Sequence, residues 1–95
     1  MTATPIRDQL EAALRTAFSP QHLEVFDDSH RHADHAGSHP EGESHFRAII
    51  VTEKFAGKNR VARQREVNAS VRELLAQRIH ALQLFTYTPE EFATK

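Results

Sequence analysis

The chain has 95 residues, a length that fits one small domain covering residues 1–95. Its 12 Lys and Arg residues nearly balance 13 Asp and Glu residues, and the net charge of −1 excludes a general electrostatic attraction to nucleic acid or anionic lipid. The chain has no cysteine, so it offers neither disulfides nor thiolate metal ligands, and any metal chemistry falls to histidine and carboxylate.

The first predicted element is an amphipathic helix that begins near Thr4 and Pro5 and ends before Pro20. Its apolar residues recur every four positions: Ile6, Leu10, Leu14 and Phe18. A strand is predicted next over residues 22–27, HLEVFD, because this segment is rich in β-branched and aromatic residues and partly alternates.

The strongest strand prediction covers residues 46–52, FRAIIVT, whose continuous apolar centre indicates burial on both faces and a central place in the sheet. After a turn at residues 55–58, apolar residues at helical spacing predict a long helix that ends near Gln77. A third strand is predicted over residues 79–86. A capping box at residues 88–91 predicts a short last helix.

The predicted order is helix, strand, strand, helix, strand, helix, which indicates an α+β fold with a small sheet covered by helices. The first two strands are consecutive and are expected to pair antiparallel, whereas the helical crossover between the second and third implies a parallel pair. His45 and His80 stand at the starts of those two strands. Since neighbouring strands lie about 4.8 Å apart, both histidines are expected at one end of the sheet.

Histidines are concentrated at this end. Five of the seven lie in the segment DSHRHADHAGSHPEGESHF, residues 28–46. Three interpretations are open: a metal site, a polar surface loop that happens to be rich in histidine, and a pH-sensitive binding surface. The predicted loop at residues 29–44 exceeds the usual length of about 12–15 residues, which favours a functional role. No HExxH spacing is present, so a catalytic zinc site is not expected.

Each of these histidines also has an interpretation without a functional role. His80 could be a half-buried residue hydrogen-bonded to backbone, and His45 has the same alternative. The additional loop histidines could collect divalent ions without that being their role. They are His30, His32, His35 and His39.

The chain resembles the BolA family over nearly its whole length. The motifs that carry the resemblance are SHRH at 29–32, GESHFRAIIV at 42–51, FAGK at 55–58, RVARQREVN at 60–68 and IHALQLFTYTPEEF at 79–92. The resemblance implies a small three-stranded mixed sheet with helices packed on it, of the αββααβα type and similar to the class II KH arrangement.

The resemblance also implies a function: a non-enzymatic adaptor that forms a heterodimer with a monothiol CGFS glutaredoxin and shares a [2Fe–2S] cluster with it. Such a protein would serve iron–sulfur cluster assembly and trafficking, or iron and redox sensing. Glutaredoxin and glutathione would supply thiolates, and this chain would supply imidazole from His80 plus either His45 or His32, which match the family's motif histidines. Rieske centres show that cluster iron accepts imidazole. The free protein is expected as a monomer or weak dimer.

Two departures from the family pattern affect the expected site. Arg63, Gln64 and Arg65 stand where the family often has Arg-His-Arg, so the long helix offers no histidine. The loop carries an insertion at residues 38–42, and His35 and His39 fall outside the usual pattern. The identity of the loop ligand therefore stays open.

The alternative function is a DNA-binding transcriptional regulator. Its candidate residues form a local basic group around the start of the long helix: Lys58, Arg60, Arg63 and Arg65. Some family members are described as transcription regulators, but the GxxG loop of KH domains is absent. The same arginines could instead form a solvated helix face or dock an acidic partner.

Other classes of protein receive little support. No cysteine nucleophile, paired-carboxylate pattern or phosphate-binding glycine loop indicates an enzyme. The first residues lack the layout of a secretion signal, and Asp8 and Glu11 are untypical of transit peptides. No apolar run approaches the ~20 residues that span a bilayer. We expect a soluble, cytoplasmic protein with no membrane partner.

Overall fold

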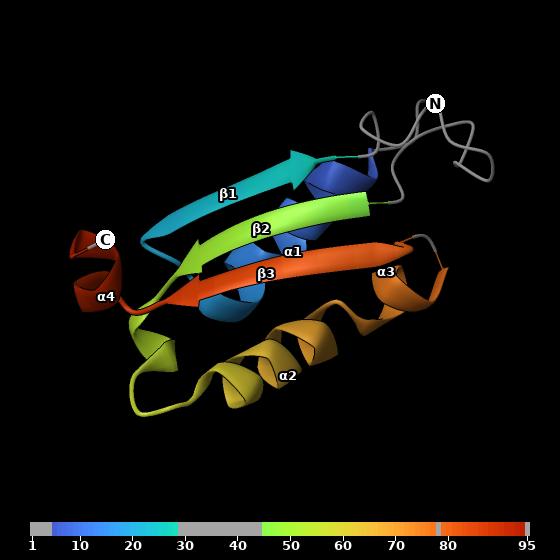
Figure 1. Cartoon of the computed structure of the whole chain (residues 1–95). Coiled ribbons are helices and arrows are strands. Elements are labelled where there is room, and N and C mark those ends of the chain that lie inside the picture. The colour runs from blue at the N-terminus through green and yellow to red at the C-terminus, as the bar shows by residue number, and fades with distance from the viewer. Residues whose placement is uncertain (1–4, 29–44, 78, 95) are drawn as a thin grey trace.

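The computed structural model describes residues 5–28, 45–77 and 79–94, which form a three-stranded sheet and its helices (Figure 1). In chain order the elements are α1 (Ile6–Phe18), β1 (His22–Asp27), β2 (His45–Val51), the short 3-10 helix η2 (Glu53–Phe55), α2 (Arg60–Ser70), α3 (Arg72–Gln77), β3 (Ala81–Tyr87) and α4 (Pro89–Ala93). The predicted α+β fold and its αββααβα order are confirmed. The predicted loop and its histidines lie outside the described residues.

The sheet has the order β1-β2-β3, with β2 in the centre and β1 and β3 as edges. β1 pairs antiparallel with β2, and His22 lies opposite Val51. β3 pairs parallel with β2, and Ala81 lies opposite His45. Both predicted pairings are therefore confirmed. In Figure 1, β2 and β3 run side by side toward the end of the sheet where α4 lies.

One face of the sheet packs against α1 and α2. The side chains of Phe46, Ala48 and Ile50 are buried on this face, since alternate residues of a strand point to the same side. The core joins both helices, η2 and all three strands, and comprises Ile6, Leu10, Leu14, Phe18, Val25, Phe46, Ala48, Ile50, Phe55, Val67, Val71, Ile79 and Leu84. The intervening residues of β2, including His45, point to the opposite face.

Helix α1 ends as predicted before Pro20. Ser19 adopts the left-handed conformation, with φ 44°, and its amide bonds to the Arg15 carbonyl at 2.9 Å. At the other end of α1, Pro5 is the N-cap and Ile6 is the first helical residue, one position later than the sequence suggested.

The long helix predicted to end near Gln77 is divided at Val71 into α2 and α3. The Ser70 hydroxyl donates to the Val67 carbonyl at 2.7 Å and competes with the backbone for that acceptor. The Val71 amide is consequently shared between the Val67 and Asn68 carbonyls, at 3.3 Å from each. Apolar periodicity continues through the break because Val71 itself is buried, so the sequence pattern did not reveal it.

The predicted capping box at the start of α4 is confirmed. The Thr88 hydroxyl accepts from the Glu91 amide, and the Glu91 carboxylate accepts from the Thr88 amide at 2.8 Å. Among the described residues, no helix combines the length and apolar character needed to cross a bilayer.

Candidate functional site

His45 and His80 lie together at the end of the sheet where β2 and β3 begin. His45 is the first residue of β2, and His80 immediately precedes β3. Their ring centroids are 5.2 Å apart, with the ring planes inclined by 48°. The prediction that parallel pairing brings these two histidines to one end of the sheet is confirmed.

The two histidines differ in their exposure and in their place relative to the strands. The Asp28 amide donates to the His45 carbonyl at 2.8 Å, which extends the β1–β2 ladder to the first residue of β2. His45 is half-buried, whereas His80 is exposed just before its strand. The pair thus combines one half-buried histidine, whose backbone belongs to the sheet, with one exposed histidine. The third candidate, His32, lies outside the described residues.

The separation of the two rings fits coordination of one metal ion. Two imidazoles that bind an ion through nitrogens at about 2.1 Å, with a tetrahedral angle between them, have ring centres roughly 5 Å apart. Within residues 5–28, 45–77 and 79–94, no group of three or more His, Asp or Glu side chains could hold a metal ion. Two imidazoles fill half of a tetrahedral set, so a complete centre built on this pair needs donors from elsewhere.

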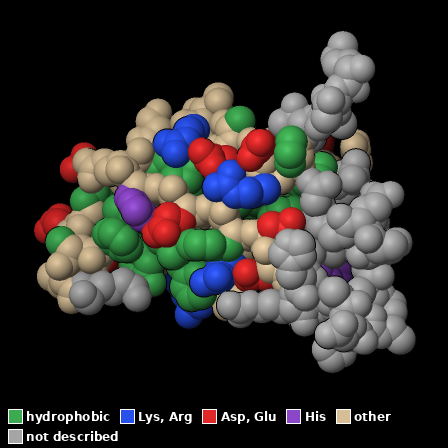
Figure 2. All heavy atoms as spheres, turned by 90° about the horizontal axis from the view of Figure 1, so that it is seen from above, with side chains coloured by type: hydrophobic (Ala, Val, Ile, Leu, Met, Phe, Trp, Pro, Cys, Tyr) green, Lys and Arg blue, Asp and Glu red, His purple; other side chains and the backbone are tan. Residues whose placement is uncertain are grey.

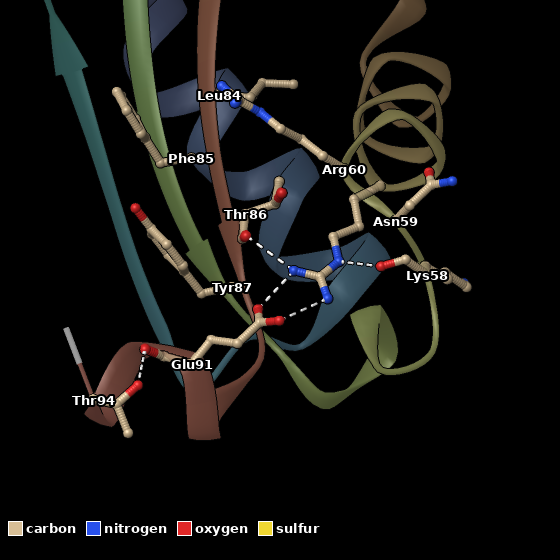
Figure 3. Close-up of a pocket in the computed structure, with 10 residues that line it drawn as sticks. Lys58, Asn59, Arg60, Leu84, Phe85, Thr86, Tyr87, Glu91 and Thr94 are labelled. Carbon is tan, nitrogen blue, oxygen red and sulfur yellow. Dashed lines mark hydrogen bonds and ion pairs between the residues drawn. The ribbon is translucent and has the colours of Figure 1, made fainter.

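The opposite end of the sheet is organised around Arg63. Its side chain is only 10% exposed, and its position four residues before Val67 places it on the buried side of α2. The guanidinium bonds to the Lys58 carbonyl at 2.8 Å and the Thr86 carbonyl at 3.1 Å. It also forms a two-pronged pair with the Glu91 carboxylate, at 2.7 and 3.1 Å (Figure 3).

This network shifts the ionisation of Glu91. The hydrogen bond from Arg63 is the main cause, followed by the backbone bond from Thr88, and together they lower the pKa of Glu91 from 4.5 to about 2. The carboxylate therefore stays charged under all ordinary conditions. Arg63 fastens α2 to the end of β3 and to α4.

The predicted nucleic-acid residues do not form a uniform basic surface. Arg63 is committed to internal bonds, and Lys58 forms an ion pair with Glu66. Arg60 and Arg65 are exposed on α2. The face seen in Figure 2, which is viewed from the β1 side and not from α2, also has acidic and basic side chains side by side rather than one sign of charge.

His22 has a separate set of contacts. Its Nε2 lies 2.7 Å from the Glu24 carboxylate, and its ring stacks on Phe92 at 5.0 Å between centroids. The Tyr87 ring also contacts Phe92, at 5.8 Å. Sequence reasoning assigned no role to His22, and these contacts tie α4 to the sheet face opposite the main core.

The fold and the site together define a small α+β domain, with a pair of imidazoles at the starts of two parallel strands and an arginine-centred network at their ends. The model of the family described as BolA-like protein matches residues 14–91. The chain belongs to the BolA-like family, and the resemblance found in its motifs is confirmed.

Relatives agree in sequence and in structure. The DNA-binding transcriptional regulator BolA of Escherichia coli (strain K12) is 42% identical over 87 residues, which cover 92% of this chain and 79% of that protein. The BolA domain of SufE1 from Arabidopsis thaliana superposes with a TM-score of 0.82 at 32% identity, covering 95% of this chain and 99% of that one. The solution structure of BolA1 from Mus musculus gives a TM-score of 0.80 at 35% identity, covering 99% of this chain and 73% of that one.

Proposed function

We propose that this protein is a non-enzymatic, cytoplasmic adaptor that binds a monothiol CGFS glutaredoxin and shares a [2Fe–2S] cluster with it. In this role it acts in iron–sulfur cluster assembly and trafficking, or in iron and redox sensing. It is a monomer or weak dimer when free and a heterodimer with glutaredoxin when loaded. The observation that carries the proposal is the His45–His80 pair, with ring centroids 5.2 Å apart.

The donor set of this chain suits a shared centre. The sequence contains no cysteine, so its own contribution to a cluster is imidazole. The cluster supplies electron storage and a transferable iron–sulfur unit, and its remaining ligands are the thiolates of glutaredoxin and glutathione. Iron–sulfur irons accept histidine in place of cysteine, which raises the reduction potential.

His80 is the proposed primary ligand because its ring is exposed beside the start of β3. Either His45 or His32 is the second candidate. His45 also has a supporting role that needs no metal bond, because its ring lies against that of His80 and restricts its orientation.

The test mixes the protein with a purified CGFS glutaredoxin that carries its cluster, and follows visible circular dichroism and the size of the complex. We expect a new spectrum for the 1:1 complex, and we expect His80→Ala to abolish that spectrum and to weaken the loaded complex at least about tenfold. His45→Ala and His32→Ala then identify the second ligand.

His22→Ala is the matched control, since it removes an imidazole whose contacts are with Glu24 and Phe92 rather than with His80. It should leave the spectrum unchanged. If His80→Ala gives the spectrum and stability of the wild-type complex, His80 is not a ligand.

The second candidate function is that of a DNA-binding transcriptional regulator. It is supported by the name of the Escherichia coli relative, a DNA-binding transcriptional regulator, and by the two exposed arginines of α2, Arg60 and Arg65. Binding to duplex DNA should weaken with salt, by a slope of about 0.9 for each phosphate contact. The double substitution of both arginines by alanine should reduce that slope by about two. Absence of binding at low ionic strength would remove this candidate.

A further inference from the structure

The outer edge of β3 borders a groove of about 660 Å³ that the proposed histidine site does not use (Figure 3). It lies between the second half of β3, the start of α2 and α4. Its lining includes Lys58, Arg60, Arg63, Leu84, Thr86 and Glu91. The groove follows the second half of β3, whereas the histidine pair lies at the starts of β2 and β3.

The backbone of β3 offers hydrogen-bonding groups to this groove. The Thr52 amide donates to the Tyr87 carbonyl at 3.0 Å, so Tyr87 directs its backbone groups toward the β2 side. Successive residues of a strand point their N–H and C=O groups in opposite directions, and Leu84 and Thr86 therefore direct theirs toward the groove. The bond from Arg63 to the Thr86 carbonyl, at 3.1 Å, agrees with this direction.

Leu84 is the position where the edge is open. Its side chain packs in the core, which leaves the residue as a whole 7% exposed, and outside the sheet ladder no residue within the described ranges forms a hydrogen bond with its backbone. An edge amide and carbonyl that lack a protein partner can gain one from an added strand. The other edge of the sheet is closed at the comparable position, since Arg7 donates to the Val25 carbonyl at 2.9 Å.

One cation beside this open edge is uncommitted. Lys58 is paired with Glu66, and Arg63 is paired with Glu91. Arg60 is exposed and forms no ion pair with any of the described residues. In Figure 3 its side chain extends from α2 across the groove toward β3. Among the described residues that line the groove, Arg60 is therefore the positive charge without an ion pair, and it lies next to the strand edge.

We propose that the outer edge of β3 binds an extended, acidic segment of a partner protein as an added strand. The main chain of that segment bonds to the amide and carbonyl of Leu84, and one of its carboxylates pairs with Arg60. Strand addition obtains affinity from main-chain hydrogen bonds and specificity from side chains at alternate positions. Arg63 limits the addition by occupying the Thr86 carbonyl. This inference does not depend on the histidine pair or on a bound cluster.

The groove favours a peptide over a nucleic acid strand. Two of its three cations are already neutralised, and the Glu91 carboxylate lines it, so successive phosphates would meet little net positive charge. A peptide main chain carries both a donor and an acceptor, which matches the paired groups of Leu84. An oligonucleotide has no such repeating pair along its backbone.

The experiment titrates a capped six-residue peptide of alternating valine and glutamate into the isotope-labelled full chain. We expect the Leu84 amide resonance to shift and its hydrogen exchange to slow. Arg60→Glu should weaken binding about fivefold. Arg65→Glu makes the same charge change on α2 outside the groove, and it should leave the affinity unchanged. Methylation of alternate peptide nitrogens should abolish binding.

Four results would overturn the proposal. The Leu84 amide could stay unperturbed at millimolar peptide, or a peptide of alternating valine and lysine could bind as well as the acidic one. A single-stranded oligonucleotide could perturb Leu84 and displace the peptide. Finally, Leu84 could become protected with rising protein concentration alone, which would make a second copy of the chain the occupant.

Discussion

The two ends of the parallel β2–β3 pair use their polar side chains in opposite ways. At the starts of the strands, His45 and His80 face each other with ring centroids 5.2 Å apart, and His80 is exposed. At the ends of the strands, Arg63 makes four hydrogen bonds and is 10% exposed. Donor atoms that are already bonded stabilise the fold, whereas atoms that remain accessible can bind a ligand. Residue type alone does not distinguish the two cases.

The comparison predicts that the largest loss of stability follows from changes at the Arg63 end. Arg63→Met should lower the free energy of unfolding by about 2–3 kcal/mol, because the Thr86 and Lys58 carbonyls lose a donor in a largely buried site. Chemical denaturation monitored by far-UV circular dichroism measures this. Arg65→Met, at an exposed position of the same helix, should change the stability by less than about 0.5 kcal/mol. Equal effects would mean that the network has no structural role.

The next largest effect is expected at the capping box beside Arg63. Thr88→Ala removes the side chain that caps α4, and it should cost about 1 kcal/mol. Thr88→Ser keeps the hydroxyl and should recover most of this loss, which the same denaturation experiment can measure. If serine were no better than alanine, the cap would not be the source of the stability.

The pH dependence of stability separates the contribution of the Arg63–Glu91 ion pair from that of packing. The folded-state pKa of Glu91 is lowered from 4.5 to about 2, so its contribution to stability is present above about pH 4.5 and is lost as the pH falls toward 2. Glu91→Gln should therefore be less stable than the wild type at pH 6, and the difference should shrink between pH 4.5 and 2. Denaturation midpoints of both proteins across this range provide the measurement. A constant difference would assign the effect to packing instead of charge.

The smallest effect is expected at the histidine end. His80→Ala should change the free energy of unfolding by less than about 0.5 kcal/mol, because the ring is exposed and stands outside the core. A variant that keeps the wild-type free energy of unfolding but loses binding to the cluster-loaded glutaredoxin would sharpen the contrast between the two ends. A loss comparable to that of Arg63→Met would instead make His80 a structural residue.

The sequence predicted the features that depend on local pattern and on topology rules. The central strand follows from the apolar run in β2, and the helical crossover required β3 to be parallel to it. That pairing placed His45 beside His80 although 35 positions separate them in the chain. Strand pairing converts sequence distance into spatial proximity, which is why this part of the site was predictable.

The features that the sequence did not predict depend on individual side-chain bonds. Arg63 was counted with the basic group, although its spacing of four residues from Val67 and eight from Val71 places it on the buried face of the helix. That spacing indicated a buried position, but the positive charge of arginine favoured its assignment to the exposed basic group. Glu91 was recognised as a capping residue, and its second role as partner of Arg63 needed the three-dimensional packing of α4 against the end of β3.

The most direct test of the central claim is nitrogen hyperfine coupling in the reduced [2Fe–2S] complex with a CGFS glutaredoxin, measured by pulsed electron paramagnetic resonance with only this chain's histidines labelled with ¹⁵N. We predict the coupling of a directly bound imidazole in the wild type and in His22→Ala, and its loss in His80→Ala. A wild-type complex without such coupling, or an unchanged signal in His80→Ala, would contradict the account.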